Sequence, residues 1–367
     1  MSFLQGSFSA QRFKADSPSF LPGAVDRLLA HNFNRAVAGE DGVLAGWGGG
    51  DHKYDAEITP EKNLRGDFLH WAFRVTKFAP PADEVKAQFM IELKGLMDAA
   101  GVQVPTAKMK REAREAAQSV IEEKGKDGRW DKHTLTPVVW DGKTGQVWLG
   151  TASHSNAGRF MDLFRLTFGV EIVPITPGMI LAQTDPDGED KAPDPAFGNP
   201  AWCPDGLDWL GNEFALWVIW NGNMESDGGG VDTPCVTNKV VLACPDGMYG
   251  TDTFAHVFPA SLPEFRKALS DGRLPRTTGL TLTGRGENTT LTLDPEAWVV
   301  SGAKVPELED VPPGVERETQ RLEQCRDLFT RLDDVYGQFL DTRLGDGWAE
   351  VAGRINQWTG RVPAEVG

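Results

Sequence analysis

Two amphipathic segments follow one another between residues 82 and 123. The first, about 82–100, is followed by Gly101, and after the short link VQVP (102–105) a second runs over about 106–123, with Pro105 and Thr106 suited to a helix start. In this second segment Met109, Ala113, Ala116 and Val120 repeat at helical spacing. The pattern predicts two helices, and so short a link predicts that they form an antiparallel hairpin.

The preceding residues predict a helix over 17–33, a Gly-rich turn at 46–52 and a half-buried strand over 68–78, in which apolar and polar positions partly alternate. After the hairpin, residues 133–140 and 145–152 flank the turn DGKT and predict two paired strands. A helix over 153–169, opened by a serine and closed by Gly169, and a strand over 170–175 follow.

The second half of the chain opens with a Pro-, Gly- and Asp-rich stretch, 177–208, which predicts a loop or linker. The apolar stretch 207–220 fits a buried helix or a strand, and 221–232 reads as a loop. Short strands near 237–244, 279–284 and 289–293 surround a helix over 261–270, and a long helix covers 315–344. We therefore expect an α+β fold with antiparallel sheets, an N-terminal lobe (1–176), an acidic linker (177–208), a C-terminal lobe (209–344) and a tail (345–367).

The composition is that of a soluble protein, with 40% hydrophobic and 25% charged residues. The start of the chain lacks the pattern of a secretory signal, and no stretch is apolar for long enough to form a membrane helix, so we expect a cytoplasmic protein without a membrane partner. The four cysteines show no metal-ligand spacing and are expected to be reduced thiols.

The formal net charge is -16, yet the basic residues are concentrated. Residues 68–133 hold twelve Lys and Arg against ten Asp and Glu, and KMKREAREAA (108–117) places four basic side chains within seven positions. One interpretation is a solvated helix face whose glutamates pair with the basic residues at helical spacing. The other is a site for a polyanion.

Other candidate chemistry is weak. DHKYD (51–55) contains Asp51, His52 and Asp55 but has no second ligand cluster, so a polar surface turn is favoured over a metal site. Asp67, Glu84 and Lys86 contain the residue types of a metal-dependent nuclease, which is kept as an alternative. GRGENTT (284–290) reads as a hairpin turn, no catalytic triad can be assembled, and we expect no cofactor and no metal.

Several segments carry a family resemblance through their order along the chain. They are FLPGAVDRLLAHNF (20–33) with Gly46 and Trp47, FLHWAFRVTKFAPP (68–81), EVKAQFMIELKGL (84–96), KMKREAREAA, TPVVWDGKTGQVWLGTAS (136–153), FRLTFGVEIVPITP (164–177), LGNEFALWVIWN (210–221), LPEFRKALSDGRLPRTTGLTLTG (262–284), LTLDPEAWVVSGAKVPEL (291–308) and the closing helix. Taken in this order, they resemble the recombination-associated protein RdgC family. The acidic stretch 184–208, the loop 221–232 and the residues after Gly345 depart from the family pattern.

The resemblance implies a multi-lobed, horseshoe-like chain that forms ring-shaped homodimers around duplex DNA, binds it without regard to sequence, restrains RecA-dependent recombination and associates with the nucleoid. It implies a binding protein and not an enzyme. The hairpin and the strand before it would supply the DNA-facing charge. We expect phosphate contacts from eight basic residues: Arg74, Lys77, Lys86, Lys94, Lys108, Lys110, Arg111 and Arg114. A protein-interaction or DNA-mimic role, in which the acidic surface meets the partner, is the alternative outside this class.

Overall fold

The computed structural model describes residues 3–17, 19–39, 41–203, 206–222, 233–248, 250–284 and 287–360. Within these residues the chain is α+β, with eleven α-helices and a sheet of twelve strands, which confirms the predicted class. Hydrogen bonds join the strands in the order β2-β4-β5-β6-β1-β12-β11-β10-β8-β9, with β3 on β4 and β7 on β1. The sheet is antiparallel and open, as expected of strands joined by hairpins.

The strands have these bounds: β1 Phe8–Ala15, β2 Leu44–Gly48, β3 Leu64–Arg65, β4 Phe68–Phe78, β5 Asp131–Asp141, β6 Gln146–Leu149, β7 Ile172–Pro174, β8 Thr233–Ala243, β9 Thr251–Ala255, β10 Leu274–Gly284, β11 Glu287–Asp294 and β12 Val299–Lys304. The helices have these: α1 Ala24–Ala30, α2 Pro60–Asn63, α3 Ala82–Ala100, α4 Ala107–Gly125, α5 Ala157–Phe168, α6 Pro177–Thr184, α7 Gly188–Lys191, α8 Leu210–Asn221, α9 Pro263–Ser270, α10 Val315–Leu344 and α11 Trp348–Thr359.

The chain divides into two compact units that are discontinuous in sequence. Unit 1 comprises residues 1–22, 63–70 and 137–367, and unit 2 comprises residues 23–62 and 71–136. The boundary passes through β4 and β5, so it does not coincide with the lobe boundary expected at residue 176. Unit 2 contains the basic hairpin, and all eight candidate DNA-binding residues lie in it.

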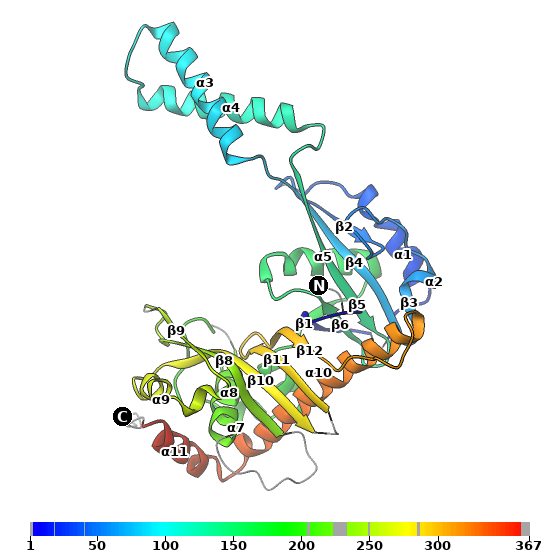
Figure 1. The fold of residues 1–367 in the computed structure, drawn as a ribbon, viewed down its shortest axis with the longest axis vertical. Coiled ribbons are helices and arrows are strands. Elements are labelled where there is room, and N and C mark those ends of the chain that lie inside the picture. Colours follow the sequence, from blue (N-terminus) through cyan, green and yellow to red (C-terminus); the bar gives the residue numbers. More distant parts are fainter. Residues whose placement is uncertain are drawn as a thin grey trace. The chain divides into compact units, whose positions relative to one another are not determined.

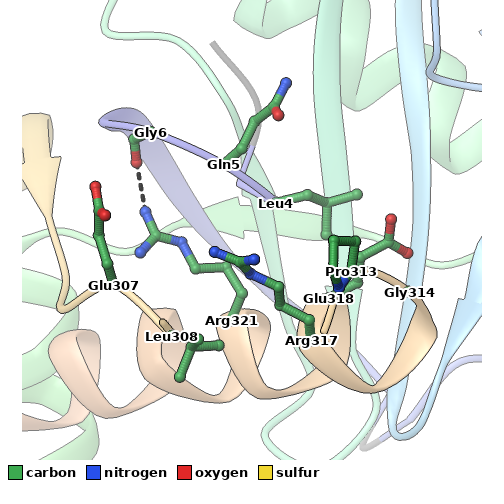
Figure 2. Close-up of a pocket in the computed structure, with 10 residues that line it drawn as sticks. All are labelled: Leu4, Gln5, Gly6, Glu307, Leu308, Pro313, Gly314, Arg317, Glu318 and Arg321. Atoms are coloured by element: carbon green, nitrogen blue, oxygen red, sulfur yellow. Dashed lines mark hydrogen bonds between the residues drawn. The ribbon is translucent and has the colours of Figure 1, made fainter. Parts of the chain in front are cut away.

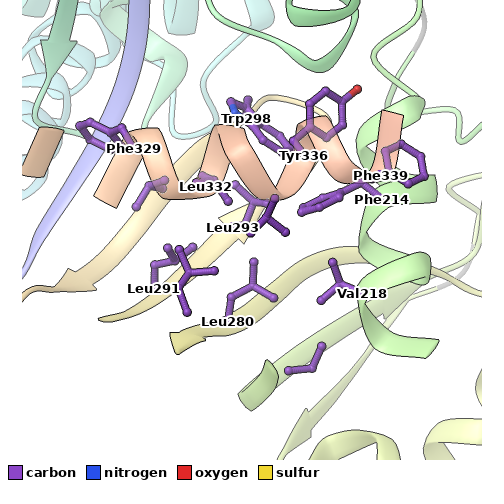
Figure 3. Packing of buried hydrophobic residues seen from close by; sticks show 14 of the residues in the cluster. Phe214, Val218, Leu280, Leu291, Leu293, Trp298, Phe329, Leu332, Tyr336 and Phe339 are labelled. Atoms are coloured by element: carbon purple, nitrogen blue, oxygen red, sulfur yellow. The ribbon is translucent and has the colours of Figure 1, made fainter. Parts of the chain in front are cut away.

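The core of unit 1 lies between its sheet and two helices, α8 and α10. Helix α10 turns Phe329, Leu332 and Phe339 inward at spacings of three and seven, as its sequence predicts, and all are buried. Figure 3 shows these side chains above Leu280 and Leu291 of the neighbouring strands. The apolar stretch 207–220 is resolved as a helix, α8, because every residue from Leu210 to Trp220 is buried and an all-round apolar helix satisfies its own backbone in such a core.

Unit 2 is built on β2 and the second part of β4, and its hairpin of α3 and α4 confirms the predicted one (Figure 1). Gly101 ends α3 in the left-handed conformation (φ 64°), and the hydroxyl of Thr106 caps α4 by accepting the N–H of Met109 at 3.2 Å. The buried stripe of α4 consists of Ala113, Ala117, Ile121 and Gly125. The predicted stripe shares only Ala113 with it, and Met109 is half-buried.

Several predicted elements are wrong. The Gly-rich turn at 46–52 begins as strand β2, because Gly46 lets the backbone approach Phe33: a Cβ on Gly46 would lie 2.5 Å from the Phe33 Cα. The strand predicted over 68–78 is confirmed as β4 with the same bounds, but it is not half-buried, since residues 68–76 are buried on both faces. The predicted helix over 17–33 is shorter, with only α1 and a 3-10 turn at Phe33–Arg35.

The second half also departs from expectation. The predicted linker 177–208 contains α6, which Thr176 caps and Pro177 opens, and the short α7. The predicted tail contains α11, whose Ile355 is fully buried in the core of unit 1. Strands β9 and β12 were not predicted, and most of the loop expected at 221–232 lies outside the described residues. The four cysteines are free, as expected.

Candidate nucleic-acid interface

Four candidate residues stand on the first two turns of α4. Lys108, Lys110, Arg111 and Arg114 are all exposed. Lys110 has no ion pair with any described residue, and the guanidinium of Arg114 lies 5.8 Å from the ring centroid of Phe89. Because residues three and four apart share a helix face, Lys110, Arg111 and Arg114 present their charges to one flank.

The glutamates of α4 neutralise this cluster only in part. Lys108 pairs with Glu112 at 3.7 Å and Arg111 with Glu115 at 3.9 Å, and the side chains of both cations remain more than 70% exposed. Exposed pairs of this kind contribute roughly 0.3–0.5 kcal/mol, so an incoming phosphate can displace them. The solvated-face interpretation is therefore correct for these two contacts and leaves Lys110 and Arg114 without a carboxylate partner among the described residues.

Three further candidates lie on the parts of unit 2 next to this cluster in sequence. Lys86 and Lys94 stand on α3, and Lys77 is the first exposed residue of β4 after a run of nine buried ones. All three are exposed, and none forms an ion pair with a described residue. The structure thus places seven of the eight candidates at the surface of unit 2.

The eighth candidate, Arg74, lies inside unit 2 and is only 8% exposed. Its guanidinium carbon is 3.9 Å from the ring centroid of Phe33, and its Nη2 donates to Nδ1 of His133 at 3.0 Å. The hydroxyl of Thr76 lies 2.9 Å from the same nitrogen. Since a guanidinium only donates, this nitrogen is an acceptor, and the imidazole is neutral. Burial, and then the charge of Arg74, lower the pKa of His133.

Lys132 is a further cation of this surface, and the sequence did not single it out. The N–H of Ala79 donates to the carbonyl of Trp130 at 2.9 Å, and Thr76 contacts His133, which fixes the register of β4 against β5. That register places Lys132 opposite Lys77, and both are exposed. Like charges directly opposite one another are destabilising, so this pair favours an anionic partner.

A groove at the base of the hairpin adds apolar surface. It has a volume of about 370 Å³ and is lined by Phe78, Val85, Phe89 and Ile121, with Arg114 in its wall. On the hairpin itself Met90 is 55% and Ile91 is 62% exposed. Adjacent exposed apolar side chains of this size are typical of contact surfaces.

In the DHKYD turn, Asp55 accepts hydrogen bonds from residues on both sides of it in the sequence. Asp55 is 7% exposed, and its carboxylate accepts from Lys62 Nζ at 2.7 Å and from the N–H groups of Asp51 and Glu57. Burial would raise the pKa of Asp55, but these hydrogen bonds outweigh it and lower the pKa. Residues 51–54 are exposed, as expected of a polar surface turn, and only Asp55 is buried. The Asp55 carboxylate oxygens that a metal would need are already occupied by these hydrogen bonds.

The nuclease alternative draws Asp67 from unit 1 and Glu84 from unit 2. Among the described residues, no three His, Cys, Asp or Glu side chains gather as they would around a metal ion. None of the helices in the described ranges is both long enough and apolar enough to cross a membrane.

The charge of the protein is divided unequally between the units. Unit 2 holds 16 Lys and Arg against 17 Asp and Glu, whereas unit 1 holds 21 against 36. Nearly all of the net negative charge therefore belongs to unit 1. No protein-family model matches the chain, and no curated protein sequence is detectably similar to it.

Proposed function

We propose that the hairpin of unit 2 binds duplex DNA through its phosphates, without reading the sequence, as the RdgC-like order of segments implies. The observation that carries the proposal is the exposure of seven predicted cations on one compact unit, of which all but Lys108 and Arg111 have no ion pair with a described residue. Arg74 is left out of the proposed interface because its guanidinium is enclosed by Phe33 and His133.

The physics of polyelectrolytes favours such a surface. Duplex DNA carries about one charge per 1.7 Å, and each phosphate that a Lys or Arg neutralises releases condensed counterions. Long, mobile lysine and arginine side chains suit the regular phosphate backbone and need no base-edge geometry. Binding through them is salt-sensitive and indifferent to sequence.

The net charge of -16 does not oppose this proposal at short range. Exposed charges more than about 10 Å apart are largely screened at 0.1 M salt. Unit 2 is nearly neutral overall, and the glutamates of α4 oppose a phosphate only through weak, exposed pairs with Lys108 and Arg111. The acidic residues of unit 1 favour solubility and weaken the long-range electrostatic attraction between the protein and DNA.

A second copy of the chain would multiply these contacts. The exposed Met90, Ile91 and Val104 supply apolar surface on the hairpin through which two copies could pair, and a homodimer would present two cationic hairpins to one duplex. By occupying DNA in the nucleoid, such a dimer would restrain RecA-dependent strand exchange. This part of the proposal rests on the family resemblance.

A gel-shift experiment with two unrelated duplexes of equal length tests the function. The proposal expects equal retention of both duplexes at low salt and loss of both when the salt is raised. Absence of retention at low salt would instead favour the acidic-surface role, and degradation of the duplex on adding Mg²⁺ would favour the nuclease.

A further inference from the structure

A cavity of about 440 Å³ opens in unit 1 at the start of α10 (Figure 2). Its walls come from the chain before β1 (Leu4 to Gly6), from the loop before α10 and from the first two turns of α10 itself. Its volume falls in the range of small-molecule sites, about 300–1,000 Å³. None of the residues proposed to bind DNA lines it.

Two arginines of α10, Arg317 and Arg321, line this cavity four residues apart, on one helix face. Arg321 is only 7% exposed, and its hydrogen bonds go to backbone carbonyls: those of Val305 at 3.2 Å, Pro306 at 3.4 Å and Gly6. Its Nε has no hydrogen-bond partner among the described residues. A guanidinium so buried is held here by neutral acceptors alone.

Arg317 is half-buried and forms no hydrogen bond or ion pair with any described residue. Figure 2 shows its guanidinium in the cavity near that of Arg321. Two like charges at this spacing repel one another, and neither has a carboxylate partner among the described residues. An anion that accepted from Arg317 would compensate the charge of both arginines.

The other groups that line the cavity leave most of the positive charge of Arg317 and Arg321 uncompensated. Glu318 also lines it, but its carboxylate is paired with Nε of Arg65. Gly314 begins α10 without a side-chain cap, so the first N–H groups of a 30-residue helix lack an intrahelical acceptor at the cavity rim. Glu307 is the one uncompensated carboxylate among the described lining residues, and Figure 2 shows it beside Gly6, on the far side of Arg321 from Arg317.

We infer that this cavity binds a small organic anion through an oxyanion group, phosphate or carboxylate, held by the guanidinium of Arg317 and the start of α10. The bidentate geometry of a guanidinium matches both groups. The space beyond the oxyanion accommodates the remainder of the ligand against Leu4 and Leu308. The inference is independent of DNA binding, since it concerns the other unit.

Isothermal titration calorimetry on the full chain, at constant ionic strength, tests it with inorganic phosphate in one series and citrate in another. We expect saturable binding of one anion per chain in at least one series, and which series responds identifies the oxyanion. Arg317→Ala should weaken that binding tenfold or more, because a charge-assisted hydrogen bond is lost. Arg354→Ala, which removes an exposed arginine of α11 in the same unit, should leave it unchanged.

Three results would overturn the inference. These are the absence of saturable binding in both series, equal affinity in Arg317→Ala and the wild type, or a loss of duplex-DNA affinity in Arg317→Ala, which would assign the arginine to DNA. Circular dichroism of Arg317→Ala, expected to match the wild type because the side chain has no described partner, separates loss of the site from loss of the fold.

Discussion

The guanidinium of Arg74 lies 3.9 Å from the ring centroid of Phe33. Arg74 therefore stacks on an aromatic ring, although its sequence context predicts a contact with a DNA phosphate. The stacked pair is buried in unit 2, and a hydrogen bond to His133 fixes its orientation. A desolvated cation on an aromatic face contributes about 2 kcal/mol. Arg74 is therefore expected to stabilise unit 2, while the exposed Lys77, three residues later, is expected to bind DNA.

Arg74→Met and Lys77→Met separate these two roles. Arg74→Met should lower the free energy of unfolding in urea by about 2 kcal/mol or more, through loss of the stacking and of the hydrogen bond to His133. Its DNA affinity, measured where the variant is still folded, should stay within about twofold of wild type. Lys77→Met should weaken DNA binding without lowering stability, and it should raise stability slightly because it relieves the repulsion from Lys132. The reverse pattern would place Arg74 in the interface.

His133 is expected to make unit 2 sensitive to acid. Burial and the charge of Arg74 lower its pKa below the ordinary value of 6.5, so the unfolded chain binds the proton at a higher pH than the folded one. Stability from this group is complete above about pH 6.5 and is lost as the pH falls towards the folded-state pKa. His133→Asn keeps an acceptor but cannot be protonated. Between pH 7.5 and 5.5 its unfolding free energy should fall less than that of the wild type, and an equal fall would remove the role of His133.

Lys132, which lies opposite Lys77 and was not among the candidates from the sequence, is also expected to contact a phosphate. Lys132→Ala should reduce the slope of log K against log salt by about one, the value for one phosphate contact. Lys143→Ala, which changes an exposed lysine of unit 1, is the matched control and should leave the slope unchanged. Fluorescence anisotropy of a labelled duplex gives both slopes, and equal slopes for Lys132→Ala and wild type would exclude Lys132 from the interface.

A buried carboxyl in unit 1 predicts a pH effect of opposite sign. Burial, reinforced by the neighbouring Asp294, raises the pKa of Glu296 to about 7, although Trp202 Nε1 donates to it at 2.9 Å and Asn212 Nδ2 at 3.0 Å. The folded state then binds the proton more tightly, so its stabilising effect is complete below the unfolded pKa, near 4.3, and is lost as the pH rises through about 7.

Glu296→Gln removes this titration and keeps an oxygen for Trp202 and Asn212. Its unfolding free energy relative to wild type should therefore be higher at pH 8 than at pH 5, as chemical denaturation at the two pH values can measure. A difference between variant and wild type that is the same at both pH values would show that Glu296 is ionised throughout this range.

The predictable part of this fold is the part with strong local signals. The hairpin, its glycine end and threonine cap, the strand pair around DGKT and the 30-residue α10 each follow from patterns within one segment. Strand β2 could not be predicted in this way, since Gly46 is required by Phe33, which is close only after folding. Helix α11, by contrast, has a local pattern, with Val351, Ala352, Ile355 and Trp358 at spacings of three and four, although a tail was expected there; its Ile355 is fully buried against the core.

The residues of the candidate interface also divide into those that a local sequence pattern predicts and those that it does not. Exposure of the four cations of α4 follows from the helical period, which separates them from the buried alanines. The burial of Arg74 could not be derived from its strand, because both faces of β4 are covered at that position. Lys132 could be recognised as an interface residue only from the register of β4 and β5, which places it opposite Lys77 and which no local pattern specifies.

The salt dependence of duplex binding, compared between the wild type and Lys110→Glu/Arg111→Glu/Arg114→Glu, tests the central claim most directly. A control that reverses three exposed cations of unit 1, Lys143→Glu/Lys267→Glu/Arg354→Glu, carries the same change in net charge. The account predicts a slope of log K against log salt that falls by about three in the hairpin variant, with near-complete loss of binding at 0.1 M salt, and a much smaller loss in the control. Equal binding by the hairpin variant and the control would contradict it.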